Sequence, residues 1–369
     1  MSQHSDVLIV GGGVIGLTAA YFLARDGASV EVLDQGDFGQ EASWAGAGIL
    51  PPGGPSNART PFEQLRAQSA ALFPTLSAEL RERTGIDNGY LRCGGLEILG
   101  DEPNLADDEW HAEGIQAEIL SEKEARRLEP ALAPGLGWAC HIPEMAQLRN
   151  PRHIKALLAA CHSLGVRLRP DCPARGFRRD GGRLHSIRTA AGDIAAGQFL
   201  LAAGAWTEML LDLVGWQPGI RPIRGQIVLL NTGTSLFRRI VLDGKRYLVP
   251  RPDGRVLIGS TEEDIGFDKR TTAGATRELL GFAIRLVPAL AEASVERSWA
   301  GLRPGSPDGL PFLGRVPGFQ NLFVAAGHFR AGIQLSPGTA LVLTELLLGR
   351  PLTIPLEPFC LDRAVAFRS

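Results

Sequence analysis

The chain has 369 residues, with 38 Lys and Arg against 40 Asp and Glu, which gives a formal net charge of −2. Hydrophobic residues make up 44% of the sequence and charged residues 21%, values that exclude a disordered or low-complexity chain. The near-neutral charge contains no basic block, which argues against electrostatic binding of nucleic acid. At about 150 residues per domain the length predicts two or three domains, and the 45 glycines indicate many tight turns or close backbone contacts with a ligand.

The five cysteines are scattered without a CxxC pair, and the seven histidines show no ligand spacing. The sequence therefore predicts neither a disulfide framework nor a metal site, and a reducing, cytoplasmic location is expected. Residues 7–24 carry no charge and are long enough to suggest a membrane span or signal peptide. However, residues 1–6 contain no Lys or Arg, and each of the glycines at 11–13 would weaken a helix by ~1 kcal/mol. We expect no membrane span.

The first predicted elements, in chain order, are a strand, a glycine turn, a helix and a second strand. The short β-branched run Val7–Val10 is typical of a strand buried in a parallel sheet. The turn at Gly11–Gly16 has the pattern G-x-G-x-x-G, and the helix is predicted at Leu17–Arg25. The second strand is predicted at Ser29–Leu33, and Asp34 stands at its carboxyl end.

Beyond this unit, helix-rich α/β segments alternate with hairpin-rich segments, so the sequence predicts two interleaved domains rather than two sequential ones. Residues 89–140 are expected to be irregular, with short strands, and the pairs Asp180-Gly181 and Asp253-Gly254 are typical of hairpin turns. Further helices are predicted at 61–84, 154–164 and 339–348, and further strands at 96–99, 166–168, 198–203, 247–251, 255–260 and 322–326.

The glycine turn has the features of a dinucleotide-binding fingerprint. Gly11 permits the tight turn out of the strand, Gly13 lets the backbone approach a pyrophosphate, and Gly16 lets the helix pack closely on the sheet. Free N–H groups at the start of the helix would face the phosphates. Asp34 would accept hydrogen bonds from the adenosine ribose and would repel a 2′-phosphate. The fingerprint alone leaves both FAD and NAD open.

Three further segments of the sequence distinguish between FAD and NAD as the cofactor. Residues 42–50 are almost all small, as a backbone pressed against a flat ring requires. Residues 202–207 have the sequence AAGAWT, and the tail runs from GLRPG at 301–305 through DGLP at 308–311 to AGHFRAGI at 326–333. In this order the segments resemble the D-amino acid oxidase family of FAD-dependent oxidoreductases. Within that family they are most similar to the glycine oxidase branch, which serves the thiazole of thiamine, and the resemblance covers essentially the whole chain.

The resemblance implies an α/β fold in which a Rossmann-type FAD-binding domain is interleaved with an α+β substrate domain built on an antiparallel sheet. The expected boundaries are 1–85, 142–220 and 312–369 for the FAD-binding domain, and 86–141 and 221–311 for the substrate domain. We expect FAD to be bound non-covalently, because no cysteine occupies a position suited to covalent attachment. The residues expected to contact FAD are Gly11, Gly13, Val14, Ile15, Gly16, Asp34, Gln35, Ala42, Ser43, Ala47, Gly48, Ile49, Ala174, Gly204, Gly327, His328, Phe329, Arg330, Ala331, Gly332, Ile333 and Gln334.

On the substrate side, the expected task is positioning, because the flavin carries the difficult chemistry. A planar arginine grips a carboxylate better than lysine does, and Arg303, in an expected glycine- and proline-bearing loop, is the predicted anchor. The resemblance points to the same residue and adds Tyr247 as a second carboxylate contact. Arg330 is expected to assist at the substrate or the reduced ring, although a surface ion pair explains it equally well. No catalytic acid or base is predicted, and His328 ranks low for that role.

The expected function is oxidation of glycine, sarcosine or a D-amino acid to the imino acid, with dioxygen reduced to hydrogen peroxide. One alternative is a dehydrogenase of the same family that passes electrons to a quinone or a protein acceptor. A second is a flavin-binding subunit without turnover of its own, and an NAD-dependent dehydrogenase is the weakest alternative. The expected partners are a small amine or amino acid, dioxygen and, from the resemblance, further copies of the chain.

Overall fold

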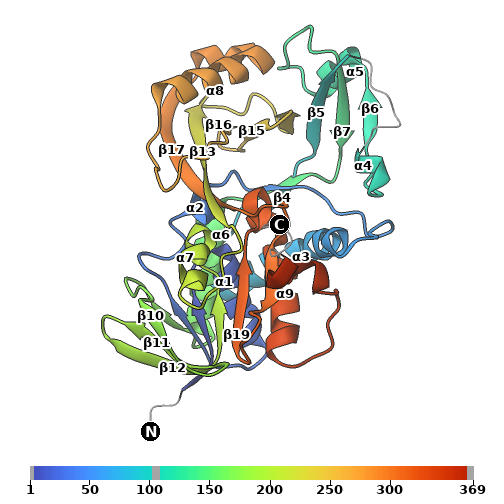
Figure 1. Ribbon diagram of the computed structural model, residues 1–369. Coiled ribbons are helices and arrows are strands. Elements are labelled where there is room, and N and C mark those ends of the chain that lie inside the picture. Colours follow the sequence, from blue (N-terminus) through green and yellow to red (C-terminus); the bar gives the residue numbers. More distant parts are fainter. Residues whose placement is uncertain (1–3, 102–108, 364–369) are drawn as a thin grey trace.

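The computed structural model describes residues 4–101 and 109–363. The parts of the expected domains at 1–3, 102–108 and 364–369 lie outside the described residues. The chain builds two large sheets and a small three-stranded one. In Figure 1 the sheet that contains β1, β12 and β19 lies with α1 and α9 in the lower half, and the sheet that contains β13 and β17 lies in the upper half under α8.

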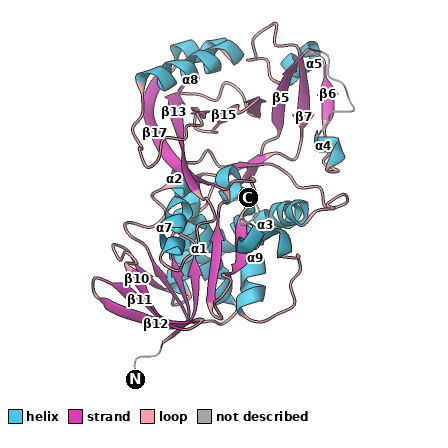
Figure 2. Cartoon of the chain, viewed as in Figure 1, coloured by secondary structure: helices cyan, strands magenta, loops and turns pink. Residues whose placement is uncertain are grey.

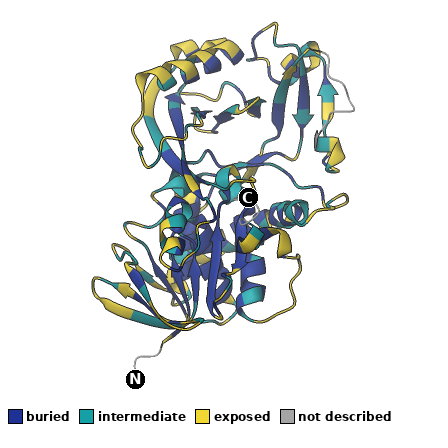
Figure 3. Ribbon diagram, in the orientation of Figure 1, coloured by how far each residue is buried: buried dark blue, intermediate teal, exposed yellow. Residues whose placement is uncertain are grey.

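The lower sheet has a parallel centre in which β19, β12, β1, β2 and β9 lie side by side. Its central strands are largely apolar and almost wholly buried, as expected for parallel strands covered on both sides, although β2 also buries Glu31 (Figure 3). The strands are β1 Ser5–Val10, β2 Val30–Leu33, β9 Arg167–Arg169, β10 Gly176–Asp180, β11 Arg183–Thr189, β12 Gly192–Leu201, β18 Phe312–Arg315 and β19 Leu322–Ala326.

Four helices pack together in the lower half: α1 Val14–Arg25, α3 Pro61–Thr84, α6 Asn150–Ser163 and α9 Gly332–Leu347 (Figures 1 and 2). The helix α3 has clear local signals at both ends. Thr60 and Glu63 form a capping box, Pro61 occupies the first turn, and Gly85 ends the helix at a φ of 71°. These signals explain why the helix predicted at 61–84 is confirmed at both ends.

The upper sheet has eight strands in the order β17-β13-β16-β15-β14-β5-β7-β6. It is antiparallel as expected except at one place, where β14 pairs with β5 in parallel. Its strands are β5 Gly95–Gly100, β6 Glu118–Leu120, β7 Trp138–Ile142, β13 Arg221–Asn231, β14 Ile240–Asp243, β15 Arg246–Pro250, β16 Arg255–Gly259 and β17 Ser294–Gly305. The small sheet joins β3 Ile49–Leu50, β8 Ala146–Gln147 and β4 Leu91–Arg92.

The remaining helices are short, apart from α8, which covers the upper sheet and has an exposed outer face (Figure 3). They are α2 Ala42–Ala45, α4 Glu109–Ala112, α5 Glu122–Leu128, α7 Thr207–Asp212 and α8 Ala273–Leu286, with 3₁₀ turns η2 Gly204–Trp206, η3 Pro288–Glu292, η4 Phe329–Ala331 and η5 Glu357–Phe359.

Several predicted elements need correction. The helix expected at 339–348 begins at Gly332 and continues through Pro337. The helix α8 and the two long strands β13 and β17 were not predicted. The region 89–140, expected to be irregular with short strands, also contains the helix α5 with a capping box at Ser121 and Glu124.

Candidate active site

A cavity of about 400 Å³ lies at the carboxyl ends of β1, β2 and β19 and also takes residues from β17, within the range of ~300–1,000 Å³ usual for ligand sites. The carboxyl edge of a parallel sheet is where ligands bind in open α/β folds. The lining segments are 10–15, 34–46, 172–174, 202–213, 302–304 and 325–333, not every residue of each contributing.

The glycine turn between β1 and α1 leaves no room for side chains. A Cβ on Gly11, which has a φ of 109°, would lie 2.3 Å from the carbonyl oxygen of Ala202. A Cβ on Gly16 would lie 1.9 Å from the carbonyl oxygen of Gly11. Gly13 caps α1 without a side chain, so the turn presents only backbone to the cavity. This close-packed geometry fits the approach of a pyrophosphate to the start of the helix.

Asp34 joins the turn to the end of β2. Its Oδ2 accepts a hydrogen bond from the N–H of Gly12 at 2.7 Å, and its Oδ1 accepts one from Gly36 at 3.1 Å. Burial raises the pKa of Asp34, while these hydrogen bonds oppose the rise. Gln35 and Ala174 line the cavity beside it. The arrangement gives the cavity a carboxylate next to the phosphate turn, where a ribose would lie.

Only part of the small-residue segment after β2 lines the cavity. Ala42 and Ser43 line the cavity, and the Oγ of Ser43 accepts a hydrogen bond from the N–H of Val14 at 2.9 Å. Ala47 does not line it; its carbonyl oxygen accepts a hydrogen bond from Nη2 of the buried Arg251 at 2.8 Å. The other expected cofactor residues outside the lining are Gly16, Gly48, Ile49, Gly327, Ala331 and Gln334.

The turn between β19 and α9 forms the opposite wall. His328, Phe329 and Arg330 line the cavity, followed by Gly332 at the start of α9. His328 is buried, its Nε2 lies 3.2 Å from Oγ1 of Thr339, and burial lowers its pKa to about 3. The imidazole is therefore neutral at physiological pH. The free N–H groups at the start of α9 give this wall a positive end.

The glycines and the proline around Arg303 predicted a loop, and that prediction was wrong. Arg303 lies near the end of β17, opposite Ile223 of β13. The long ladder between these strands overrides the local turn signals. The Arg303 guanidinium lines the cavity and donates from Nη2 to Oγ of Ser260 at 2.5 Å and from Nη1 to the carbonyl oxygen of Thr261 at 3.1 Å. Burial lowers the pKa of Arg303.

Tyr247 reaches the same place from β15. It lies opposite Gly259 of β16, where a Cβ would be 2.4 Å from the Tyr247 hydroxyl oxygen. Tyr247 is not among the cavity-lining residues, but it interacts with Arg303 and opposes the fall in the pKa of that arginine. The structure thus brings the two predicted carboxylate contacts together beside residues 259–261.

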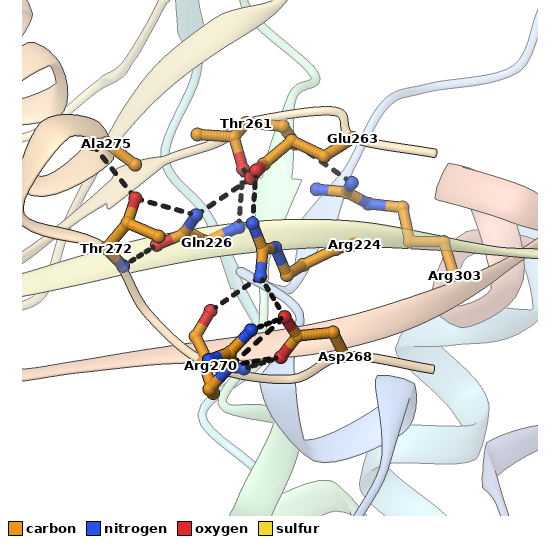
Figure 4. Close-up of polar contacts among 9 residues, drawn as sticks. All are labelled: Arg224, Gln226, Thr261, Glu263, Asp268, Arg270, Thr272, Ala275 and Arg303. Atoms are coloured by element: carbon orange, nitrogen blue, oxygen red, sulfur yellow. Dashed lines mark hydrogen bonds and ion pairs between the residues drawn. The ribbon is translucent and has the colours of Figure 1, made fainter. Parts of the chain in front are cut away.

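A polar network fixes the segment that holds Arg303 (Figure 4). The carboxylate of Glu263 accepts hydrogen bonds from Oγ1 of Thr261 at 2.6 Å, from Nε2 of Gln226 at 2.8 Å and from the buried Arg224 at 2.5 Å. Although burial opposes the change, these bonds lower the pKa of Glu263 to about 2. Residues 261–263 are therefore held by β13 while Thr261 accepts from Arg303.

Sequence reasoning missed an apolar part of the wall. This part of the cavity wall consists of Trp206, Met209, Leu210 and Leu213. Met209 and Leu213 are unusually exposed for apolar residues, at 58% and 52%. Trp206 lies within the segment 202–207, of which only Gly204 was expected to contact FAD, and the other three residues come shortly after that segment. Exposed apolar surface, a side-chain-free phosphate turn and a ribose-side carboxylate together fit a bound FAD.

Other site classes find no support in the described ranges 4–101 and 109–363. Within them there is no cluster of three or more His, Cys, Asp or Glu side chains suited to a metal ion. None of their helices is both long and apolar enough to cross a bilayer. All five cysteines fall in these ranges and none forms a disulfide.

The interleaved sheets and the glycine-walled cavity define a flavin-dependent oxidoreductase, and the chain belongs to the DAO family, FAD dependent oxidoreductase, whose model matches residues 6–346. It is 38% identical to glycine oxidase of Pseudomonas putida over 97% of this chain and 98% of that protein. It is 34% identical to hydrogen cyanide synthase subunit HcnC of Pseudomonas aeruginosa over 98% and 97%. The crystal structure of glycine oxidase from Geobacillus kaustophilus superimposes with a TM-score of 0.92 at 36% identity, covering 98% of this chain and 99% of that one.

The family and the superposition confirm three predictions from the sequence: the D-amino acid oxidase family, the α/β fold and FAD as the cofactor. They also confirm that the protein is an enzyme of the FAD-dependent amino acid oxidase class. The domain boundaries and the roles of individual site residues stay predictions.

Proposed function

We propose that the protein oxidises glycine or another small amino acid, such as sarcosine or a D-amino acid, to the imino acid, with dioxygen as electron acceptor and hydrogen peroxide as product. The observation that carries this proposal is the Arg303 guanidinium, which lines the same cavity as the FAD fingerprint. Among the ion pairs of the described residues, none includes Arg303. Its hydrogen-bond partners are neutral oxygens, which leaves its charge available for a carboxylate.

In this proposal Arg303 anchors the substrate carboxylate by paired hydrogen bonds, and Tyr247 adds its hydroxyl. FAD is held by the turn at 11–15, by Asp34 and by the segments around Ser43 and His328. When bound, FAD supplies the redox chemistry by accepting a hydride from the substrate's α-carbon. A fixed carboxylate orients that carbon, so the main contribution of the protein is positioning.

The cavity offers little for acid–base catalysis, which suits this chemistry. His328 is neutral and lies within hydrogen-bond distance of Thr339, with its pKa at about 3. It therefore contributes shape and a hydrogen bond rather than a charge. The substrate amine must reach the cavity in its neutral form, so solution pH rather than a protein base would set that fraction.

Two other functions compete with this proposal. A dehydrogenase of the same family would pass electrons to a quinone or protein acceptor. The similarity to a relative named as a synthase subunit keeps a subunit role open as well. Cytoplasmic location, a role in thiamine thiazole synthesis and assembly of like subunits are proposals that rest on the glycine oxidase similarity.

The deciding experiment is anaerobic titration of the FAD-loaded protein with glycine, sarcosine and a panel of D-amino acids, followed by visible absorbance. We expect bleaching by at least one small amino acid, and then peroxide formation in air. Dye reduction without peroxide would favour the dehydrogenase, and no bleaching by any amine would favour a subunit without turnover.

The role of Arg303 has its own test. Arg303→Ala should raise KM for the amino acid by about 100-fold or more, as expected from removing a charge-assisted anchor, with FAD still bound. Arg297→Ala is the matched control, because Arg297 lies on the same strand, is exposed and does not line the cavity. Unchanged kinetics in Arg303→Ala would overturn the assignment.

A further inference from the structure

The cavity contains two arginines whose charges are compensated differently. Arg303 and Arg330 both line it, Arg303 from β17 and Arg330 from the turn before α9. Arg303 donates to the neutral oxygens of Ser260 Oγ and the Thr261 carbonyl and interacts with the Tyr247 side chain. Arg330 instead donates from Nη2 to the carboxylate of Glu262. One short segment, residues 260–262, thus serves both guanidinium groups.

Glu262 remains charged in this setting. Partial burial raises its pKa, but Arg330 and Lys245 outweigh that effect and hold the pKa below its usual value. Lys245 is the weaker partner, since its Nζ lies 3.4 Å from Oε1 of Glu262 and its side chain is 76% exposed. Arg330 lowers the pKa of Arg303 and Glu262 raises it, so the three groups are close enough to interact electrostatically.

The charge balance therefore leaves one cation available for an incoming acid. A substrate with one carboxylate uses Arg303. Glu262 does not itself line the cavity and acts on it through its ion pair with Arg330. A second carboxylate on the same small substrate would meet an Arg330 whose charge Glu262 already compensates. Repulsion between that carboxylate and Glu262 would disfavour binding, most strongly where water is partly excluded.

We propose that Glu262 is a specificity-determining residue that restricts the site to substrates with a single carboxylate, by occupying the guanidinium of Arg330. This inference rests on the proposed amine oxidation and deepens it. It makes the preference for monocarboxylic amino acids a property of an ion pair in the protein rather than of cavity size alone.

The test compares diacids with monoamides of the same shape in the FAD-loaded enzyme. The pairs are D-aspartate with D-asparagine and iminodiacetate with its monoamide, which place the second group on carbon or on nitrogen. Glu262→Gln should raise the diacid-to-monoamide ratio of kcat/KM in at least one pair by about 5- to 50-fold, the range expected for removing one partly screened charge. Malonate and its monoamide, titrated against flavin absorbance, give the same comparison without turnover.

Glu278→Gln is the matched control, because Glu278 of α8 forms a similar ion pair at 3.0 Å with Arg246, and Arg246, unlike Arg330, does not line the cavity. It should leave the ratios within about twofold, below the effect of even a weak surface ion pair. Arg330→Gln should act in the opposite direction to Glu262→Gln, since it leaves the Glu262 carboxylate uncompensated. This second variant keeps the proposal testable if Glu262→Gln does not fold.

The outcomes separate this inference from the proposed function. If glycine is oxidised but neither variant changes the diacid-to-monoamide ratio or the malonate affinity, Glu262 does not set specificity. If no amine is oxidised by the wild-type enzyme, the proposed function itself fails, whatever the malonate titrations give. A gain for diacids in Glu262→Gln that disappears in the double variant with Arg330→Gln would support the ion pair as the cause.

Discussion

Replacing Gly225 by alanine should move the Arg303 guanidinium without unfolding the protein. Gly225 lies in β13, and a Cβ there would be 2.2 Å from Nη2 of Arg303 and 2.3 Å from its Cζ and Nη1. These atoms are the terminal group of a long side chain, so the guanidinium can move away from the new methyl group while the strand stays in place. The substitution therefore tests the anchor while leaving Arg303 itself in the sequence.

The expected magnitude follows from the contacts that the guanidinium would lose. Its displacement breaks the hydrogen bonds to Ser260 and Thr261, which are 2.5 and 3.1 Å long, and misdirects its charge in the cavity. A hydrogen bond to a charged group contributes about 1.5–3 kcal/mol. Losing that amount from the substrate contact would lower kcat/KM by about 10- to 150-fold. We expect the loss mainly in KM, because the carboxylate is held equally in the ground and transition states.

The assay is steady-state oxidation of glycine, with thermal unfolding and flavin content measured on the same samples. Gly281→Ala is the control, because Gly281 lies in α8 with nothing within 4 Å of a new methyl group. It should leave kinetics unchanged and stabilise the helix by up to about 1 kcal/mol. The reasoning is refuted if Gly225→Ala keeps its wild-type kcat/KM, or if its activity falls only in proportion to lost flavin.

Three further predictions concern stability and cofactor binding. Gly16→Ala places a methyl group 1.9 Å from the carbonyl oxygen of Gly11; it should cost at least about 1–3 kcal/mol and lower the flavin absorbance of the purified protein, and normal FAD content would contradict the packing. Acid precipitation of the holoenzyme should leave the flavin in the supernatant, and flavin in the pellet would indicate a covalent bond. Burial lowers the pKa of His153 to about 4 and of His328 to about 3, from 6.5. Both histidines stay neutral in the folded protein but take up a proton in the unfolded one, so the free energy of unfolding should fall as the pH drops from 6.5 towards 4, by about 1.4 kcal/mol per pH unit for each histidine. Urea titrations at several pH values measure this dependence. If His153→Gln has the same dependence on pH as the wild type, His153 does not contribute to it.

The parts of the fold that were predictable have local signals that agree with their surroundings. The β-branched strand, the glycine turn and the following helix of the first unit all occur as expected, as do β19 and the turn after it. At Gly11 and Gly16 the fold requires the glycine that the motif predicts, because any side chain there would collide with the backbone. Such positions can be interpreted from sequence alone.

The upper half was harder, because distant pairing decides it. Gly301, Pro304 and Gly305 favour a turn, yet they lie in β17, paired with β13 over its whole length. Gly301 is required there by close approach, since a Cβ would lie 2.5 Å from that of Ala45. The helix α8 did have a signal in the sequence, because Leu279, Phe282, Ala283 and Leu286 recur at helical spacing, and these four residues are buried. Glu262 had none, because its partners come from other elements.

The order in which the chain visits its two large sheets has a consequence for how such enzymes diversify. The lower sheet is assembled from three separate stretches of polypeptide and the upper sheet from two. Neither half is encoded as one continuous block, so a single cut or truncation would not release either as an independently folding fragment. Exchange of the upper half for another would therefore require two stretches of the chain to be replaced together, whereas a point substitution within it requires no such coordinated change.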